Sequence, residues 1–221
     1  NASASGGNIL QQGWIDVRIK DEARFRVGKF KTPFFHAVQT TLGETLFPIL
    51  PISLTSTVIM PYSLNAVWPT IGTSFDLGAE FHGTANLGTE NSWKIHYEVG
   101  VWNGTGSGVN TATKTLSDDH KIPSLLYAGR LTFMPWGKMP KTQGNYKMLD
   151  SRFMEFGVSG GYNDESESES TNDARLAIEF SMLYNHWYIG VEGYWMNVSF
   201  TKRQKINKPI NYFGGYAQIG Y

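Results

Sequence analysis

The stretch 174–184, with the sequence ARLAIEFSMLY, alternates between two kinds of side chain. Its even positions are all apolar or aromatic, and its odd positions include Arg175, Glu179 and Ser181. Successive side chains of a β-strand point to opposite faces. The stretch therefore predicts a long strand with one apolar and one polar face.

The same alternation recurs along the whole chain, and a helical period is almost absent. Nine strands are predicted, joined in order by links of very different length. Their ranges are 9–18, 23–31, 73–84, 92–103, 125–135, 152–162, 174–184, 187–199 and 211–221. The longest apolar stretch, 46–54, is too short for a membrane helix and contains two prolines. This does not exclude a transmembrane β-barrel, because each strand that crosses the membrane needs only about ten alternating residues.

A soluble β-sandwich also alternates apolar and polar positions. Three features favour an antiparallel transmembrane β-barrel instead. The predicted strands are longer than the five or six residues common in soluble proteins, aromatic residues such as Trp93, Trp102 and Trp187 lie at strand ends, and short links mostly alternate with long ones. The link 136–151 is the exception, since it is long where a short one is expected. We expect one barrel domain over 1–221 and, from the odd strand number, further strands outside this sequence.

Composition excludes several other classes of protein. The chain has 19 Lys and Arg, 19 Asp and Glu and no Cys. No disulfide, Cys–zinc site or thiol nucleophile is possible, and the balanced charge argues against nucleic-acid binding. Residues 157–161 match G-x-S-x-G, but the serine lies inside a predicted strand rather than at a sharp turn. Glu80, His82, His96 and Glu98 could hold a metal or form a hydrogen-bond network. We expect no enzyme activity, no cofactor and no metal.

Five segments carry distinctive motifs: 24–34 (RFRVGKFKTPF), 76–83 (DLGAEFHG), 97–106 (YEVGVWNGTG), 129–137 (GRLTFMPWG) and 215–221 (GYAQIGY). In their order and spacing they resemble the phosphate-selective porin O and P family. The resemblance implies a 16-stranded trimeric barrel of the bacterial outer membrane, in which a long loop folds inward as a constriction.

Charged side chains on the polar face should line water, because they are costly against lipid. The basic residues of two neighbouring strands form a stripe that would attract anions; alternatively, they pair with Asp16, Glu80 and neighbouring carboxylates. The alternation slips within 23–31, and a bulge near Gly28 would bring all four bases of that strand inside. The predicted anion pathway comprises Arg18, Lys20, Arg24, Arg26, Lys29, Lys31, Lys94, Arg130 and Arg175.

The segment 32–72 is too long for an ordinary loop and contains five prolines and many apolar residues. We expect it to fold into the lumen, either as a constriction or as a plug that only stiffens the barrel. The sequence predicts a passive outer-membrane porin for small hydrophilic solutes, with a moderate anion preference and phosphate as one candidate. The alternative is a structural or adhesive barrel with a closed lumen. The expected partners are small anions, outer-membrane lipids, lipopolysaccharide and two further copies of the chain.

Overall fold

The computed structural model describes residues 12–34, 36–40, 75–87, 93–102, 125–143, 152–163, 171–200 and 208–221. Within these ranges the chain forms strands and one helix of a single turn, α1 (His36–Gln39). The strands are β1 (Gly13–Lys20), β2 (Ala23–Lys31), β3 (Phe75–Leu87), β4 (Trp93–Trp102), β5 (Leu126–Met134), β6 (Phe153–Asn163), β7 (Thr171–Tyr184), β8 (Trp187–Phe200) and β9 (Ile210–Gly220).

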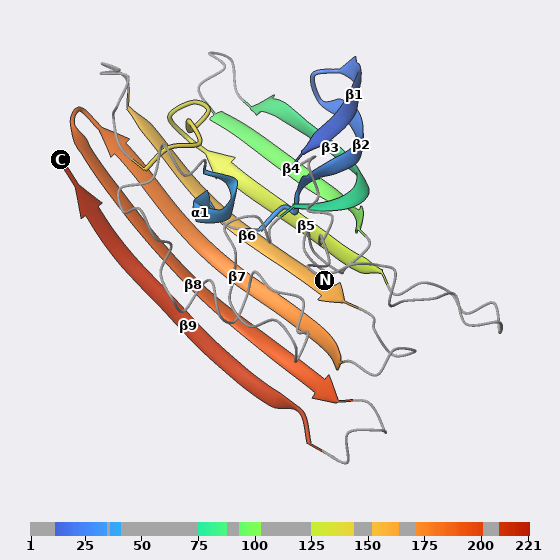
Figure 1. The fold of residues 1–221 in the computed structure, drawn as a ribbon. Helices are drawn as coiled ribbons and strands as arrows, with labels where there is room; N and C mark the ends of the chain where they lie inside the picture. Colours follow the sequence, from blue (N-terminus) through green and yellow to red (C-terminus); the bar gives the residue numbers. More distant parts are fainter. Residues whose placement is uncertain are drawn as a thin grey trace, which may run out of the picture.

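All nine strands belong to one sheet in which each strand pairs antiparallel with its neighbours in the sequence. Figure 1 shows this sheet as a curved, tilted wall with α1 lying against it. The predicted fold class, an all-β antiparallel sheet, is confirmed. Among the described residues β1 and β9 each pair with one strand, so the sheet is not closed there. No helix in the described part of the chain is long and apolar enough to cross a membrane.

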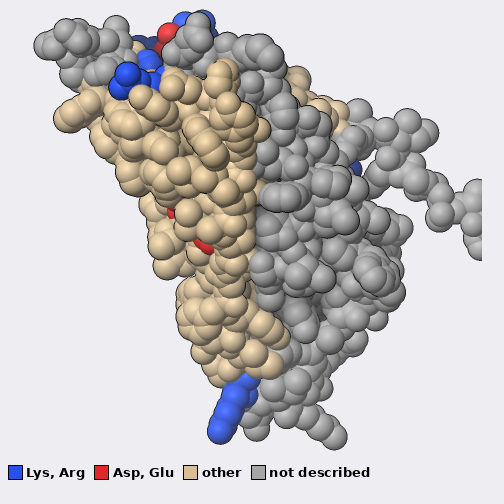
Figure 2. All heavy atoms as spheres, turned by 90° about the vertical axis from the view of Figure 1, so that its left-hand side faces the viewer, with Lys and Arg blue, Asp and Glu red and all other residues tan. Residues whose placement is uncertain are grey.

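One face of the sheet exposes large apolar side chains along most of its strands. Leu77 and Ile178, for example, are 61% and 64% exposed, and Phe81 and Val99 are 54% exposed. Figure 2 shows one side of the molecule on which uncharged residues lie between Lys and Arg at the two ends, interrupted by two small acidic areas. We call the face with the exposed apolar side chains the outer face. It carries the odd residues of 75–81 and 93–101, as predicted, although Phe75 is buried at the start of β3.

The opposite, inner face holds charged residues together with a small apolar core. Phe30, Trp102 and Tyr194 belong to this core, as does Phe34, which follows β2. Aromatic side chains of this core pack directly against glycine residues of the strands. A Cβ atom on Gly78 would be 2.4 Å from Trp102 Cδ1, and one on Gly161 would be 2.9 Å from Phe34 Cζ. The glycines therefore make room for aromatic rings close to the backbone of the sheet.

The bulge predicted near Gly28 is wrong. The pairing of β2 with β1 and with β3 continues without a shift through Gly28, whose φ is +138°. The irregularity lies in β1 instead, between Arg18 and Lys20. Lys29 is paired with Leu77 of the outer face. Because directly opposed residues share a face, the register does not bring Lys29 to the inner face.

Candidate functional site

Arg130 lies at the centre of a buried ionic network on the inner face. Its guanidinium contacts Glu155 and Glu179 at 2.6 Å each and Glu98 at 3.6 Å. The three carboxylates come from β4, β6 and β7, so four strands meet at one side chain. All four residues are at most 6% exposed. An arginine is suited to this position because its planar fork presents five N–H donors.

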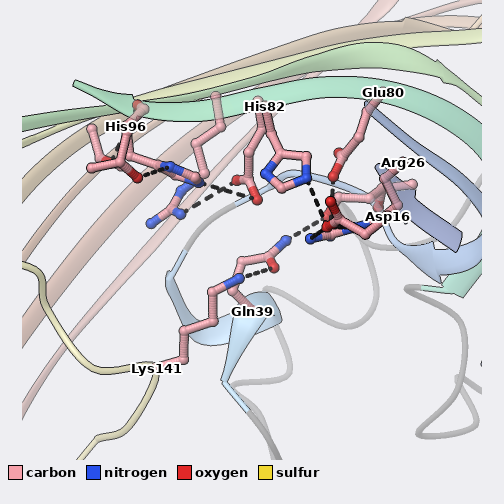
Figure 3. Close-up of polar contacts among 12 residues, drawn as sticks. Asp16, Arg26, Gln39, Glu80, His82, His96 and Lys141 are labelled. Carbon is pink, nitrogen blue, oxygen red and sulfur yellow. Dashed lines mark hydrogen bonds and ion pairs between the residues drawn. The ribbon is translucent and has the colours of Figure 1, made fainter. Parts of the chain in front are cut away.

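Two segments outside the strands meet above this network. The backbone N–H of His36, at the start of α1, donates to Glu179 Oε2 at 2.6 Å, and His36 Nδ1 is 3.4 Å from Glu155 Oε1. His36 Nε2 is 3.1 Å from the carbonyl oxygen of Thr142, in the segment after β5. Lys141 of that segment donates to Gln39 Oε1 at 3.0 Å (Figure 3). The chain after β2 is thus held to the chain after β5.

The electrostatic surroundings of His36 favour its charged form. Burial by itself would lower the pKa of the imidazole, but Glu155, Glu179 and the carbonyl of Thr142 outweigh burial. The pKa of His36 therefore lies above its ordinary value. Lys31, at the end of β2, also connects this strand to the residue after α1, because its ammonium group donates to the carbonyl of Thr40 at 2.7 Å.

A second ionic group lies between β1, β2 and β3. Arg26 contacts Asp16 at 3.1 Å and Glu80 at 3.0 Å, and His82 Nε2 is 3.0 Å from the same oxygen of Asp16. Figure 3 shows these four side chains converging on one another. His96 contacts Thr84 and Glu98, and its ring also lies edge-on to that of His82, with the ring centres 6.4 Å apart. Among the described residues no set of three His, Asp or Glu side chains is placed to hold a metal ion.

The bases nearest the turn between β1 and β2 pair at the rim of the sheet. Arg18 and Arg24 contact Asp21 at 2.8 and 3.1 Å. The hydrogen bond from Arg24 holds the pKa of the Asp21 carboxyl below its ordinary value despite some desolvation, and Arg18 adds to the effect. Three residues of the predicted basic stripe, Arg18, Arg24 and Arg26, are therefore paired with carboxylates.

A cavity of about 530 Å³ lies on the inner face between these groups. Six of its lining residues are Lys or Arg, three are Asp or Glu and three are His. The charged and histidine residues are Arg24, Arg26, Lys94, Arg130, Lys138, Lys141, Asp21, Glu98, Glu155, His36, His82 and His96. The lining therefore has an excess of basic side chains, although the inner face as a whole is mixed in sign.

The structure brings four predicted pathway residues to this cavity: Arg24, Arg26, Lys94 and Arg130. Lys20 is exposed near the rim, and Lys31 reaches the residues around α1. Arg175 is buried beside the ring of Phe34, 5.8 Å from its centre. Lys29 shares the face of Leu77, as described above.

Sequence reasoning did not select His36, Lys138 or Lys141. Neither segment that carries them has a periodic pattern, so the alternation of side chains did not indicate that they lie on the inner face of the sheet. The one available signal was the unexpected length of the link 136–151. The described part of 32–72 lies on the inner face through Phe34, His36 and Gln39; the rest of that predicted constriction lies outside the described residues.

An antiparallel sheet in sequence order, with an exposed apolar outer face and a charged inner face, has the construction of a transmembrane β-barrel wall that faces a lumen. The chain belongs to the family of phosphate-selective porins O and P, whose model matches residues 1–221. The protein is thus a porin of the bacterial outer membrane. No curated protein and no solved structure matched the chain.

Proposed function

We propose that the protein is a passive diffusion channel with a moderate preference for small anions. The observation that carries this proposal is the lining of the inner cavity, where Lys and Arg outnumber Asp and Glu by six to three. A cluster of like charge in a lumen raises the local concentration of the oppositely charged solute. Conduction also needs weak binding, so that the solute can leave.

The pairing within the lumen supports a moderate preference rather than tight selection. Arg130 donates to carboxylates, and Arg26 is shared between Asp16 and Glu80. Selection of phosphate requires several donors that converge on one oxyanion. Lys138 and Lys141 are exposed side chains in the cavity lining and are the better candidates for direct contact with a passing anion. Phosphate is one such anion.

The exposed apolar side chains of the outer face support a proposal about the assembly. We infer a homotrimer whose exposed apolar side chains contact outer-membrane lipids, with lipopolysaccharide around the longer loops. The constriction by 32–72 and the single barrel domain belong to the same proposal. They are supported by the position of residues 32–34 and 36–40 against the inner face.

The ion preference can be tested by reversing charge in the cavity lining. In the double variant Lys94→Glu and Lys138→Glu, two lining bases become acids, so the zero-current potential in a salt gradient should move toward cation preference. The measurement is single-channel recording in a planar bilayer. The matched control is Lys208→Glu, an exposed lysine just before β9 that does not line the cavity.

The control should keep the anion preference of the unchanged protein. An unchanged potential in the double variant, with channels still formed, would show that the cavity does not line the conduction path. Absence of any conductance in the unchanged protein would favour the closed, structural barrel.

A further inference from the structure

The contact between residues 36–40 and 138–143 joins two segments that leave the sheet at opposite rims. Consecutive strands of this antiparallel sheet run in opposite directions, so β2 and β5 have their C-terminal ends at opposite rims. The first segment follows β2 and the second follows β5, yet they meet on the inner face through His36–Thr142 and Gln39–Lys141. A chain from one rim is therefore bonded to a chain from the other rim within the lumen.

His36 is the centre of this contact, and both of its ring nitrogens face oxygen atoms. Nε2 faces the carbonyl of Thr142, which can only accept, and Nδ1 faces the carboxylate of Glu155. A neutral imidazole has one N–H, whereas the imidazolium has two. Only the protonated ring can donate toward both oxygens. In the neutral ring one lone pair must face an oxygen atom, which weakens the contact.

The other ionisable groups around His36 come from every element packed against it. Glu155 lies on β6, Glu179 on β7 and Arg130 on β5; Tyr188 of β8 stacks at 6.3 Å, and Lys141 lies on the opposite segment. Among these residue types histidine is the one whose ordinary pKa falls near neutral pH. Two carboxylates face His36, and both also bind Arg130, which stays charged at all accessible pH values.

We propose that residues 36–40 and 138–143 form a latch on the inner face of β5–β8, which is closed when His36 is protonated and loosens when His36 loses its proton. The proposal concerns regulation of the same pore and rests on the proposed channel function. It makes the width of the pore a function of pH, without any change in the strands of the wall.

The direction of the effect follows from the raised pKa of His36. A group whose pKa is raised on folding stabilises its contacts fully below its ordinary pKa, and that stabilisation is lost as the pH rises through the raised value. The latch should therefore hold at mildly acidic pH and open above the raised pKa. Conductance should rise in a step over that range.

The experiment is single-channel recording from mildly acidic to mildly alkaline pH in symmetric salt. The unchanged protein should show the step, and His36→Gln, which can hydrogen bond but cannot be protonated, should lose it. His186→Gln, an exposed histidine in the turn between β7 and β8, should retain the step. A step that persists in His36→Gln, or that disappears in His82→Gln instead, would overturn the latch.

A second variant keeps His36 intact in case its replacement prevents folding. The chain has no cysteine, so Gln39→Cys with Lys141→Cys allows the two segments to be joined by a short thiol-reactive crosslinker. Crosslinking should abolish the pH step, and a step that survives it would refute the latch. Channels that form but ignore pH in the unchanged protein would refute the latch alone, whereas a protein without channels would refute the proposed function.

Discussion

At the scale of single residues, Arg130 shows how the inner wall depends on one side chain. Its guanidinium neutralises carboxylates from three other strands at 2.6 to 3.6 Å, and all of them are buried. Removing one partner of a buried ionic group leaves uncompensated charge, which typically costs about 3–5 kcal/mol. Arg130→Met should therefore destabilise the folded protein by about that amount, measured as urea unfolding in detergent micelles.

Two comparisons separate loss of charge from loss of geometry at this position. Arg130→Lys keeps the charge but presents it as a point, so it should recover part of the lost stability. Arg18→Met removes an arginine whose side chain is 61% exposed and pairs at the rim. Exposed pairs contribute about 0–1 kcal/mol. If Arg130→Met were as mild as Arg18→Met, the buried network would not be a structural centre.

The glycines that lie beneath aromatic rings allow a second prediction at the residue scale, about the packing of the inner face. A Cβ atom on Gly78 would be 2.4 Å from Trp102 Cδ1 and 2.5 Å from the carbonyl oxygen of Val101. Gly78→Ala should cost about 1–3 kcal/mol through overpacking, measured by thermal unfolding in micelles. At Gly193 the nearest atom would be Ile178 Cγ1 at 3.7 Å, so Gly193→Ala should leave the melting temperature unchanged.

At the scale of the strands, the two faces of the sheet make a prediction about lipid. Val99 is 54% exposed on the outer face in the middle of β4. A charged side chain at the bilayer midplane costs about 2–4 kcal/mol, so Val99→Arg should destabilise the barrel by that amount in lipid vesicles. Thr84→Arg places the same side chain on the inner face, where it lines the cavity, and should be better tolerated. The reverse order would mean that the faces are assigned backwards.

The strands were predictable because each one separates lipid-facing from lumen-facing side chains, which gives a period of two over its whole length. The strand predicted over 125–135 is observed as β5, Leu126–Met134, and the strand predicted over 187–199 is observed as β8, Trp187–Phe200. The alternation failed at the end of β2, where Lys29 and Lys31 are out of phase with Arg24 and Arg26. The sequence predicts a bulge there, but the register is continuous, and Lys31 instead donates a hydrogen bond to the carbonyl of Thr40, beyond the strand.

The candidate site was less predictable, because part of it is built from segments with no period. The inner carboxylates and Arg130 follow from the alternation, but the contact between Gln39 and Lys141 joins residues 102 positions apart in the sequence. Such a contact depends on how two links fold back over the wall. The excess length of the link 136–151 indicated that it does more than connect two strands; it did not indicate where Lys141 would lie.

At the scale of the whole molecule, the wall combines paired charges at its core with accessible bases in its cavity, and this division sets the expected response to salt. Ionic screening acts on charges exposed to solvent, and the screening length falls from about 10 Å at 0.1 M to about 3 Å at 1 M. Attraction of anions by exposed side chains such as Lys138 and Lys141 should therefore weaken with salt, whereas the buried pairs around Arg130 should persist. We expect the anion preference, measured as the zero-current potential at a fixed salt ratio, to decline as both concentrations are raised, while resistance to urea stays nearly constant. The double variant Lys94→Glu and Lys138→Glu should show a cation preference that declines in the same way. A preference that does not change with salt would point to close, desolvated contact between the anion and its donors, and the moderate electrostatic preference proposed for this pore would then be wrong.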